Sequence, residues 1–129
     1  MKLENNDHCF VCGTKNPGGL RLAFRYSDGK ITSEFIPSRE HQGYRGITHG
    51  GIISAVLDEA MIQTALAEGI NPVTAELRVR FRKVLETGRK VVVEAGMTRK
   101  SPRLLEAHSR LLDACDGEVI AEATAKLIR

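Results

Sequence analysis

Residues 41–68 read HQGYRGITHGGIISAVLDEAMIQTALAE, and this stretch decides the fold. A glycine-rich loop ends in the triplet HGG at 49–51 and runs directly into a segment whose apolar residues cover most of a helical cylinder. The pattern predicts a largely buried helix over residues 51–68 that ends near Gly69. A helix buried in this way is covered when a sheet wraps around it.

Alternating apolar and polar residues predict strands on both sides of this helix. Before it, residues 20–26 and 31–35 flank a Ser-Asp-Gly turn and indicate a hairpin. After it, the strand pattern recurs over residues 75–82, 90–97, 104–112 and 119–128. The sequence therefore predicts an α+β fold with an antiparallel sheet of five or six strands. We expect one domain over residues 1–129, with residues 1–19 packing on the sheet.

Length and composition narrow the class of protein. A chain of 129 residues with 42% hydrophobic content supports one compact core. Apolar runs stop far short of the roughly 20 residues of a membrane span, and the first residues lack a secretory pattern, so we expect a soluble cytoplasmic protein. A net charge of +3 with 5% aromatic residues and no Trp argues against a nucleic-acid partner.

The start of the predicted helix is suited to binding negative charge. Its first amide N–H groups have no intrahelical partners and lie at the positive end of the helix dipole. An oxyanion hole requires such donors, each contributing roughly 3 kcal/mol to catalysis. Asp58 lies two helical turns further on, and Glu59 points about 100° away from it. The alternative is an ordinary loop-to-helix junction followed by an acid with a structural role.

Three segments of the sequence resemble hotdog-fold thioesterases of the phenylacetate-pathway type. They are the HGG triplet at 49–51, Asp58-Glu59-Ala60 in the helix, and the strand TAELRVRF at 74–81, at family-like intervals. The resemblance covers about residues 9–128. It implies a curved antiparallel sheet wrapped around one long central helix, and acyl-CoA as the substrate.

The resemblance also implies roles for particular residues. The Gly50 N–H would polarise the thioester carbonyl while His49 shapes the loop, and Asp58 would act as general base or as nucleophile. In this family the helix of one subunit meets strand residues of another, so we expect Thr74 of a partner chain to orient the attacking water or touch the acyl group. The active site would then need a homodimer, alone or paired into a tetramer.

Two positions of this chain differ from the family pattern, and three residues near the motif are expected to lie around the substrate. Some members place Asn where this chain has Gly43, and the neighbouring Gln42 offers an amide instead. Gly51, Gln42 and Glu59 are expected around the substrate. Val84 stands where many relatives have Pro, and we attach no function to that change.

Coenzyme A carries phosphates, which basic and hydroxyl side chains bind. The turn predicted over residues 98–103 supplies a set of this kind: Arg99, Lys100, Ser101 and Arg103. A turn that is merely solvated is the alternative. If these residues bind phosphate, losing an arginine should raise KM more than it lowers kcat.

Cys9 and Cys12, with His8 beside them, have the spacing of half a structural zinc site. A closed site needs four ligands, and no second pair follows in the sequence. Cys115 and His108 are remote candidates to complete it. The preferred interpretation is a turn that lays the N-terminal segment against the sheet, so we expect neither a metal nor another cofactor.

The combined expectation is hydrolysis of an acyl-CoA thioester, with water activated by Asp58 and the carbonyl held at Gly50. One alternative is a hotdog hydratase or dehydratase, which needs a histidine base such as His41. The other is a non-catalytic acyl-CoA-binding protein. The acyl group and the choice between general base and nucleophile stay open at this stage.

Overall fold

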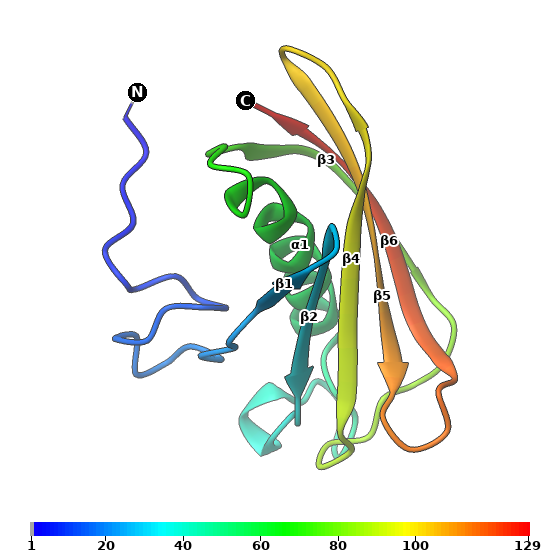
Figure 1. The fold of residues 1–129 in the computed structure, drawn as a ribbon. Coiled ribbons are helices and arrows are strands. Elements are labelled where there is room, and N and C mark those ends of the chain that lie inside the picture. Colours follow the sequence, from blue (N-terminus) through cyan, green and yellow to red (C-terminus); the bar gives the residue numbers. More distant parts are fainter. Residues whose placement is uncertain (1) are drawn as a thin grey trace.

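The structure is a computed structural model that describes residues 2–129. One long helix, α1 (Gly50–Leu66), lies against a sheet that curves around it (Figure 1). The strands are β1 (Arg25–Ser27), β2 (Lys30–Phe35), β3 (Val73–Phe81), β4 (Val91–Lys100), β5 (Leu104–Asp113) and β6 (Val119–Ile128), with a short 3-10 helix at Arg39–His41. The predicted α+β hotdog fold with one central helix is confirmed.

All neighbouring strands in the sheet are antiparallel, in the order β1-β2-β4-β5-β6-β3. The chain leaves β2, forms the helix and then crosses to the far edge to form β3. Among residues 2–129, β3 pairs only with β6, so its other edge is open, and most of its side chains are exposed.

The core lies between α1 and the concave face of the sheet. Val56, Leu57, Ala60 and Met61 of the helix are fully buried. They meet apolar side chains of the sheet, which include Val93, Leu105, Leu111 and Leu127. The buried Ser109 hydroxyl donates to the Leu57 carbonyl oxygen at 3.1 Å, which ties β5 to the helix. Apolar residues on most sides of α1 explain why it is embedded.

Several predicted boundaries differ from the structure. The strand expected over residues 20–26 is regular only from Arg25, because Arg21 has a φ of 54° and the Leu20 and Leu22 N–H groups bind the N-terminal segment. β4 continues to Lys100, which shortens the basic turn to residues 101–103. The hairpin turn is confirmed, with positive φ at Asp28 and at the glycine that follows.

The N-terminal segment, residues 2–24, contains no helix or strand. It lies beside α1 on the side away from the sheet (Figure 1), and Val11 and Leu22 join the core. Position 1, part of the segment expected to pack on the sheet, lies outside the described residues. Within the described chain, no helix has the length and apolar character needed to cross a membrane.

Candidate active site

The HGG triplet forms the start of α1, one residue earlier than predicted. His49 is the N-cap residue, and its Nδ1 accepts a hydrogen bond from the Gly51 N–H at 2.8 Å. The imidazole folds so closely over the helix start that a Cβ on Gly51 would lie 2.9 Å from Nδ1. A glycine is therefore required at position 51 for the cap to form. His49 thus caps the helix and orders the backbone at its start.

Gly50 is the first helical residue, so its N–H has no intrahelical acceptor. Within residues 2–129 no other acceptor binds it either. A Cβ on Gly50 would lie 3.4 Å from the Phe81 ring at the end of β3. The N–H group thus remains available beside an aromatic side chain.

A pocket of about 710 Å³ opens at this helix start. His49 and Gly50 line it together with Ile53, Phe81 and the 87% exposed Tyr44. Its lining is mostly apolar, as expected of a site for an acyl group. The sequence did not single out Tyr44 or Phe81 for this site. Phe81 could not be found from local sequence, because only the crossover to β3 places the end of that strand beside Gly50.

Thr48 is a further residue of this pocket that sequence reasoning missed. It is 4% exposed, and its hydroxyl oxygen has no hydrogen-bond partner among residues 2–129. Its backbone N–H donates to the Leu85 carbonyl oxygen at 2.7 Å, which fixes the loop on the strand-end segment. The only sequence signal was its place directly before the HGG triplet.

Asp58 lies in the middle of α1 and is partly buried. The Thr74 hydroxyl, at the start of β3, donates to Asp58 Oδ1 at 2.7 Å. Thr74 was expected to act from a partner chain on the attacking water or the acyl group, whereas in the structure its hydroxyl contacts Asp58 of the same chain. The hydrogen bond holds the carboxylate in one orientation and leaves its second oxygen free of this donor.

Asp58 and Gly50 are too far apart to act on the same carbonyl within one chain. Their positions differ by eight residues along the helix, which corresponds to about 12 Å along the axis. The pocket at Gly50 accordingly includes neither Asp58 nor Thr74. The candidate carbonyl-binding N–H and the candidate base of one chain therefore lie at different heights on α1.

The loop before the triplet is held by its own side chains. Gln42 Oε1 accepts from the Gly46 N–H at 3.0 Å, so the amide considered for the substrate also stabilises the loop. A Cβ on Gly43 would lie 3.3 Å from the His49 ring. The position where some relatives have Asn is therefore directly beside His49.

Glu59 points to the N-terminal segment. Its two carboxylate oxygens lie 3.5 Å from Cys9 Sγ and 3.6 Å from Cys12 Sγ, and Gln63 Nε2 donates to it at 2.8 Å. Burial, followed by the Cys9 hydrogen bond and the Glu59 charge, raises the pKa of the Cys12 thiol to about 12. The two adjacent acids of α1 thus have different surroundings, as their angular separation predicted.

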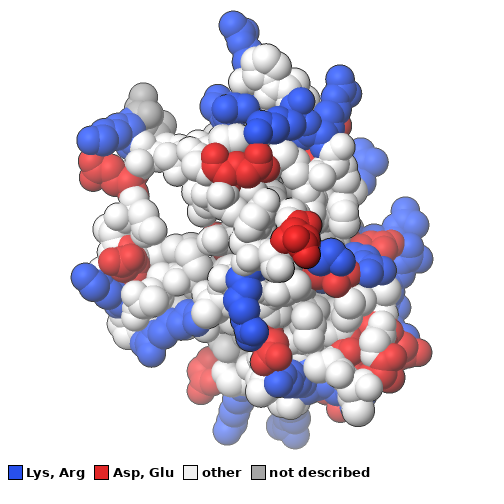
Figure 2. Space-filling view, viewed as in Figure 1, with Lys and Arg blue, Asp and Glu red and all other residues white. Residues whose placement is uncertain are grey.

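The basic turn lies at the opposite end of α1 from Gly50. Lys100 pairs with Glu68 beyond the end of the helix at 2.7 Å. The Ser101 hydroxyl donates to the Leu104 carbonyl oxygen and accepts from the Leu104 N–H, which closes the hairpin. Arg99 and Arg103 are exposed, and Figure 2 shows basic side chains gathered at this end of the molecule. Neither arginine forms an ion pair within residues 2–129, and Arg99 lies on β4 rather than in the shortened turn.

His41 and His108 lie away from this pocket. His41 Nδ1 accepts from the Ser38 N–H at 2.9 Å, and the ring lies 5.5 Å from that of Phe35. His108 is exposed on β5, as predicted. Neither lines the pocket at Gly50.

The chain belongs to the thioesterase superfamily. The family model of that description matches residues 45–120, which is more than half of the chain. Human acyl-coenzyme A thioesterase THEM5 is 29% identical over 93 residues, covering 69% of this chain and 38% of the human protein. The mouse protein of the same name is 30% identical over 73 residues, covering 57% of this chain and 29% of its own length. This chain therefore spans well under half of the length of these curated relatives.

Solved structures show the same fold at low identity. Zebra fish thioesterase superfamily member 2 has a TM-score of 0.81 and 16% identity, over 91% of this chain and 88% of that one. A phenylacetic acid degradation-related protein from Ralstonia eutropha has a TM-score of 0.75 and 22% identity, over 85% and 86%. A Streptococcus mutans protein bound to acetyl-CoA has a TM-score of 0.77 and 15% identity, over 83% and 86%.

Proposed function

We propose that this protein hydrolyses an acyl-CoA thioester to the free acid and coenzyme A. The observation that carries the proposal is the pair of half-sites on α1: a free N–H at Gly50 in a pocket, and an oriented carboxylate at Asp58. The first can stabilise the oxyanion of a tetrahedral intermediate, and the second can accept a proton from water. The acyl-CoA thioesterase names of the curated relatives support the same activity.

A second copy of the chain would unite the half-sites. Within one chain, Thr74 near one end of β3 holds Asp58, and Phe81 at the other end packs on Gly50. Two β3 strands paired antiparallel about a point near Leu77 would bring residue 74 of one chain opposite residue 81 of the other. Each Asp58 would then face the partner's Gly50 end, giving two equivalent sites in a homodimer.

The open edge of β3 supports this pairing. A nine-residue strand with an unpaired edge favours pairing with another chain unless the edge is protected. Apolar side chains are exposed along it and just after it: Val73, Leu77, Phe81 and Val84. Burying them against a second copy would remove this apolar surface from water. A further pairing of dimers into tetramers would use other surfaces.

The proposed reaction begins when water, held by Asp58, attacks the thioester carbonyl carbon. Asp58 takes a proton from the water as the C–O bond forms, and the Gly50 N–H stabilises the resulting oxyanion. The C–S bond then breaks, and coenzyme A leaves with that proton as a thiol. Thr74 orients Asp58 throughout, while Gly51 and Gln42 maintain the loop that presents Gly50. Arg99 and Arg103 are proposed to bind the phosphates of coenzyme A.

The surroundings of the histidines favour hydrolysis over hydration. A hydratase needs an imidazole beside the thioester, and His41 Nδ1 is bound to the Ser38 N–H away from the pocket. His49 Nδ1 is likewise bound, to the Gly51 N–H. The orientation of Asp58 by a dedicated hydroxyl favours catalysis over binding alone.

Incubation with a panel of aryl, short-chain and medium-chain acyl-CoAs tests the proposal, with thioester loss followed by ultraviolet absorbance. Asp58→Asn should abolish turnover and leave acyl-CoA binding intact. Asp28→Asn, the same chemical change in the β1–β2 turn at a φ that Asn accepts, should leave turnover unchanged. Tight binding without turnover on every panel member, or an enoyl product, would exclude the proposed hydrolysis.

A further inference from the structure

Three potential metal ligands meet between the N-terminal segment and α1. Cys9 Sγ, Cys12 Sγ and a Glu59 carboxylate oxygen all lie within 4.8 Å of one another. Cys9 Sγ lies 3.5 Å from Glu59 Oε1, and Cys12 Sγ lies 3.6 Å from the other carboxylate oxygen, Oε2. A tetrahedral zinc site with Zn–S near 2.3 Å and Zn–O near 2.0 Å has S···O edges of about 3.5 Å. Each sulfur therefore lies at about this distance from one Glu59 oxygen, and all three ligand atoms are close enough together to bind one ion.

The three ligands are held in place by neighbouring groups. The Cys12 N–H donates to Cys9 Sγ at 3.4 Å, which fixes the position of that sulfur within the turn. Gln63 Nε2 donates to Glu59 at 2.8 Å and orients the carboxylate. Gly13 closes the tight turn: its N–H binds the Cys9 carbonyl oxygen at 2.9 Å, and a Cβ there would lie 2.4 Å from the Cys9 nitrogen.

We propose that Cys9, Cys12 and Glu59 form a zinc site that fastens the N-terminal segment to α1. Two thiolates and a carboxylate suit Zn²⁺, whereas Mg²⁺ and Ca²⁺ prefer oxygen ligands alone. Binding releases one proton from each thiol and replaces them with a cation shared by all three ligands. Glu59 is the ligand that the sequence could not reveal, because it lies 47 residues beyond Cys12.

The charge balance at Glu59 supports a cation. The carboxylate is half-buried, and no Lys or Arg within residues 2–129 forms an ion pair with it. Its described partners are an amide and two thiols. A carboxylate removed from water normally has a positive partner, and Zn²⁺ would supply it.

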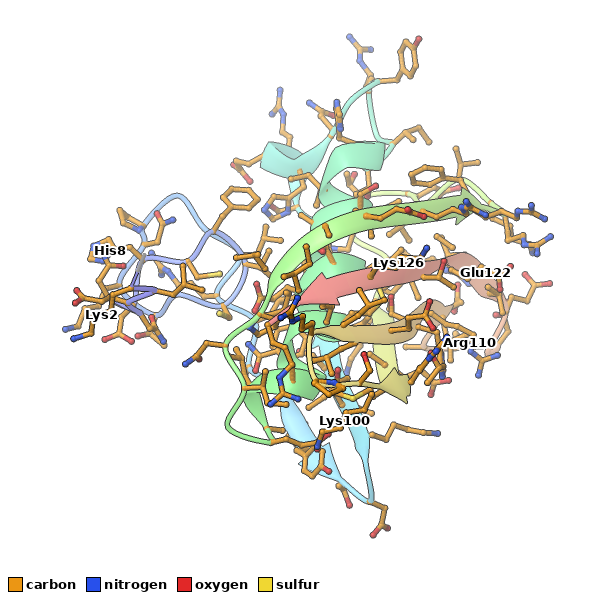
Figure 3. All side chains as sticks on the ribbon, turned by 90° about the horizontal axis from the view of Figure 1, so that it is seen from above. Lys2, His8, Lys100, Arg110, Glu122 and Lys126 are labelled. Atoms are coloured by element: carbon orange, nitrogen blue, oxygen red, sulfur yellow. The ribbon has the colours of Figure 1, made fainter. Side chains whose placement is uncertain are left out.

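The fourth position of the tetrahedron is open to water or to His8. His8 lines the same cavity as the three ligands. Its Nδ1 lies 2.8 Å from the Asn6 carbonyl oxygen, which leaves Nε2 as the nitrogen that could bind a metal. Figure 3 shows His8 on the N-terminal segment, apart from the sheet.

A metal at this place would have a structural effect. Residues 2–24 have no helix or strand and place only Val11 and Leu22 in the buried core, and small irregular segments are commonly stabilised by a metal or a disulfide. The site lies at the residue next to Asp58, so it would also brace the part of α1 that carries the proposed base.

The test measures zinc directly and is independent of thioester hydrolysis. Protein reduced and stripped of metal is titrated with Zn²⁺, and with Co²⁺ as a spectroscopic probe of thiolate ligation. We expect one equivalent per chain, thiolate-to-cobalt charge-transfer absorption, and a higher thermal unfolding midpoint with Zn²⁺. Cys9→Ser, Cys12→Ser and Glu59→Gln should each weaken binding at least about ten-fold. Cys115→Ser, which removes the remote exposed thiol, should not.

Three outcomes would overturn the zinc site. One is the absence of stoichiometric Zn²⁺ binding by the reduced protein. Another is binding that Glu59→Gln leaves unchanged, because the isosteric amide folds in the same place and lacks only the charge. The third is a Cys9–Cys12 disulfide in freshly isolated protein, detected by mass, that persists in the presence of Zn²⁺.

Discussion

The Thr74 hydroxyl donates a 2.7 Å hydrogen bond to Asp58 Oδ1, joining the start of β3 to the middle of α1. A hydrogen bond to a charged group contributes about 1.5–3 kcal/mol, so Thr74→Val should lower kcat by about 10- to 100-fold. Thr74→Ser keeps the hydroxyl and should retain most activity. Steady-state kinetics with both variants checks this, and equal loss in the two would mean that the methyl group matters rather than the hydrogen bond.

Removing the Gly50 N–H should abolish hydrolysis while preserving the helix. Proline is favoured at the first helical position, and His49 already has the extended backbone that a following proline needs. Gly50→Pro deletes the donor, whereas Gly50→Ala adds a Cβ and keeps it. The alanine variant should lose far less kcat than the proline variant. Circular dichroism of both checks that α1 is intact.

Mixing two inactive variants tests whether the site spans two chains. In a dimer of Gly50→Pro with Asp58→Asn, one of the two shared sites has neither substitution. Random pairing should therefore restore about a quarter of wild-type activity, since half of the dimers are mixed. If each site were contained in one chain, co-expression would restore nothing.

The exposed edge of β3 is expected to hold the dimer together. Leu77 is 37% exposed in the single chain, so Leu77→Asp should leave the fold intact and place a charge in the proposed interface. We expect a monomer by light scattering and loss of turnover. Tyr26→Asp makes the same kind of change at the opposite edge of the sheet, where the side chain is 50% exposed, and should stay dimeric.

Arg89 and Asp113 predict an acid-dependent component of stability. The Arg89 hydrogen bond, aided by backbone N–H groups that include that of Cys115, holds the pKa of Asp113 below its usual range. A carboxyl with a lowered folded-state pKa stabilises the fold above its ordinary pKa, about 4, and this contribution is lost as pH falls through the lowered value. Arg89→Gln should therefore lower the urea midpoint at pH 7, with the difference shrinking below about pH 4.

The matched control for this pH dependence is Arg25→Gln. Arg25 is exposed on β1 and forms no ion pair within residues 2–129. Its substitution should leave the urea midpoint nearly unchanged at both pH values. A difference for Arg89→Gln that stays constant down to pH 2 would show that the arginine acts through packing rather than through the charge of Asp113.

The sequence by itself determined the elements and the local chemistry. Apolar residues around most of the cylinder predicted a buried α1, and alternation predicted the strands, because burial and the strand period are read from neighbouring residues. The HGG triplet predicted a helix start with free amides for the same reason. The strand predicted from the sequence was wrong at residues 20–24, where the positive φ of Arg21 and hydrogen bonds to the N-terminal segment replace strand pairing.

Only the tertiary structure decided which distant residues meet. The crossover from α1 to the far edge of the sheet places Thr74 on Asp58 and Phe81 on Gly50, and it leaves β3 open to a second chain. The folding of the N-terminal segment onto the helix places Cys9 and Cys12 at Glu59. These contacts join residues 16 to 50 positions apart, and such pairings depend on the packing of the whole chain rather than on local pattern.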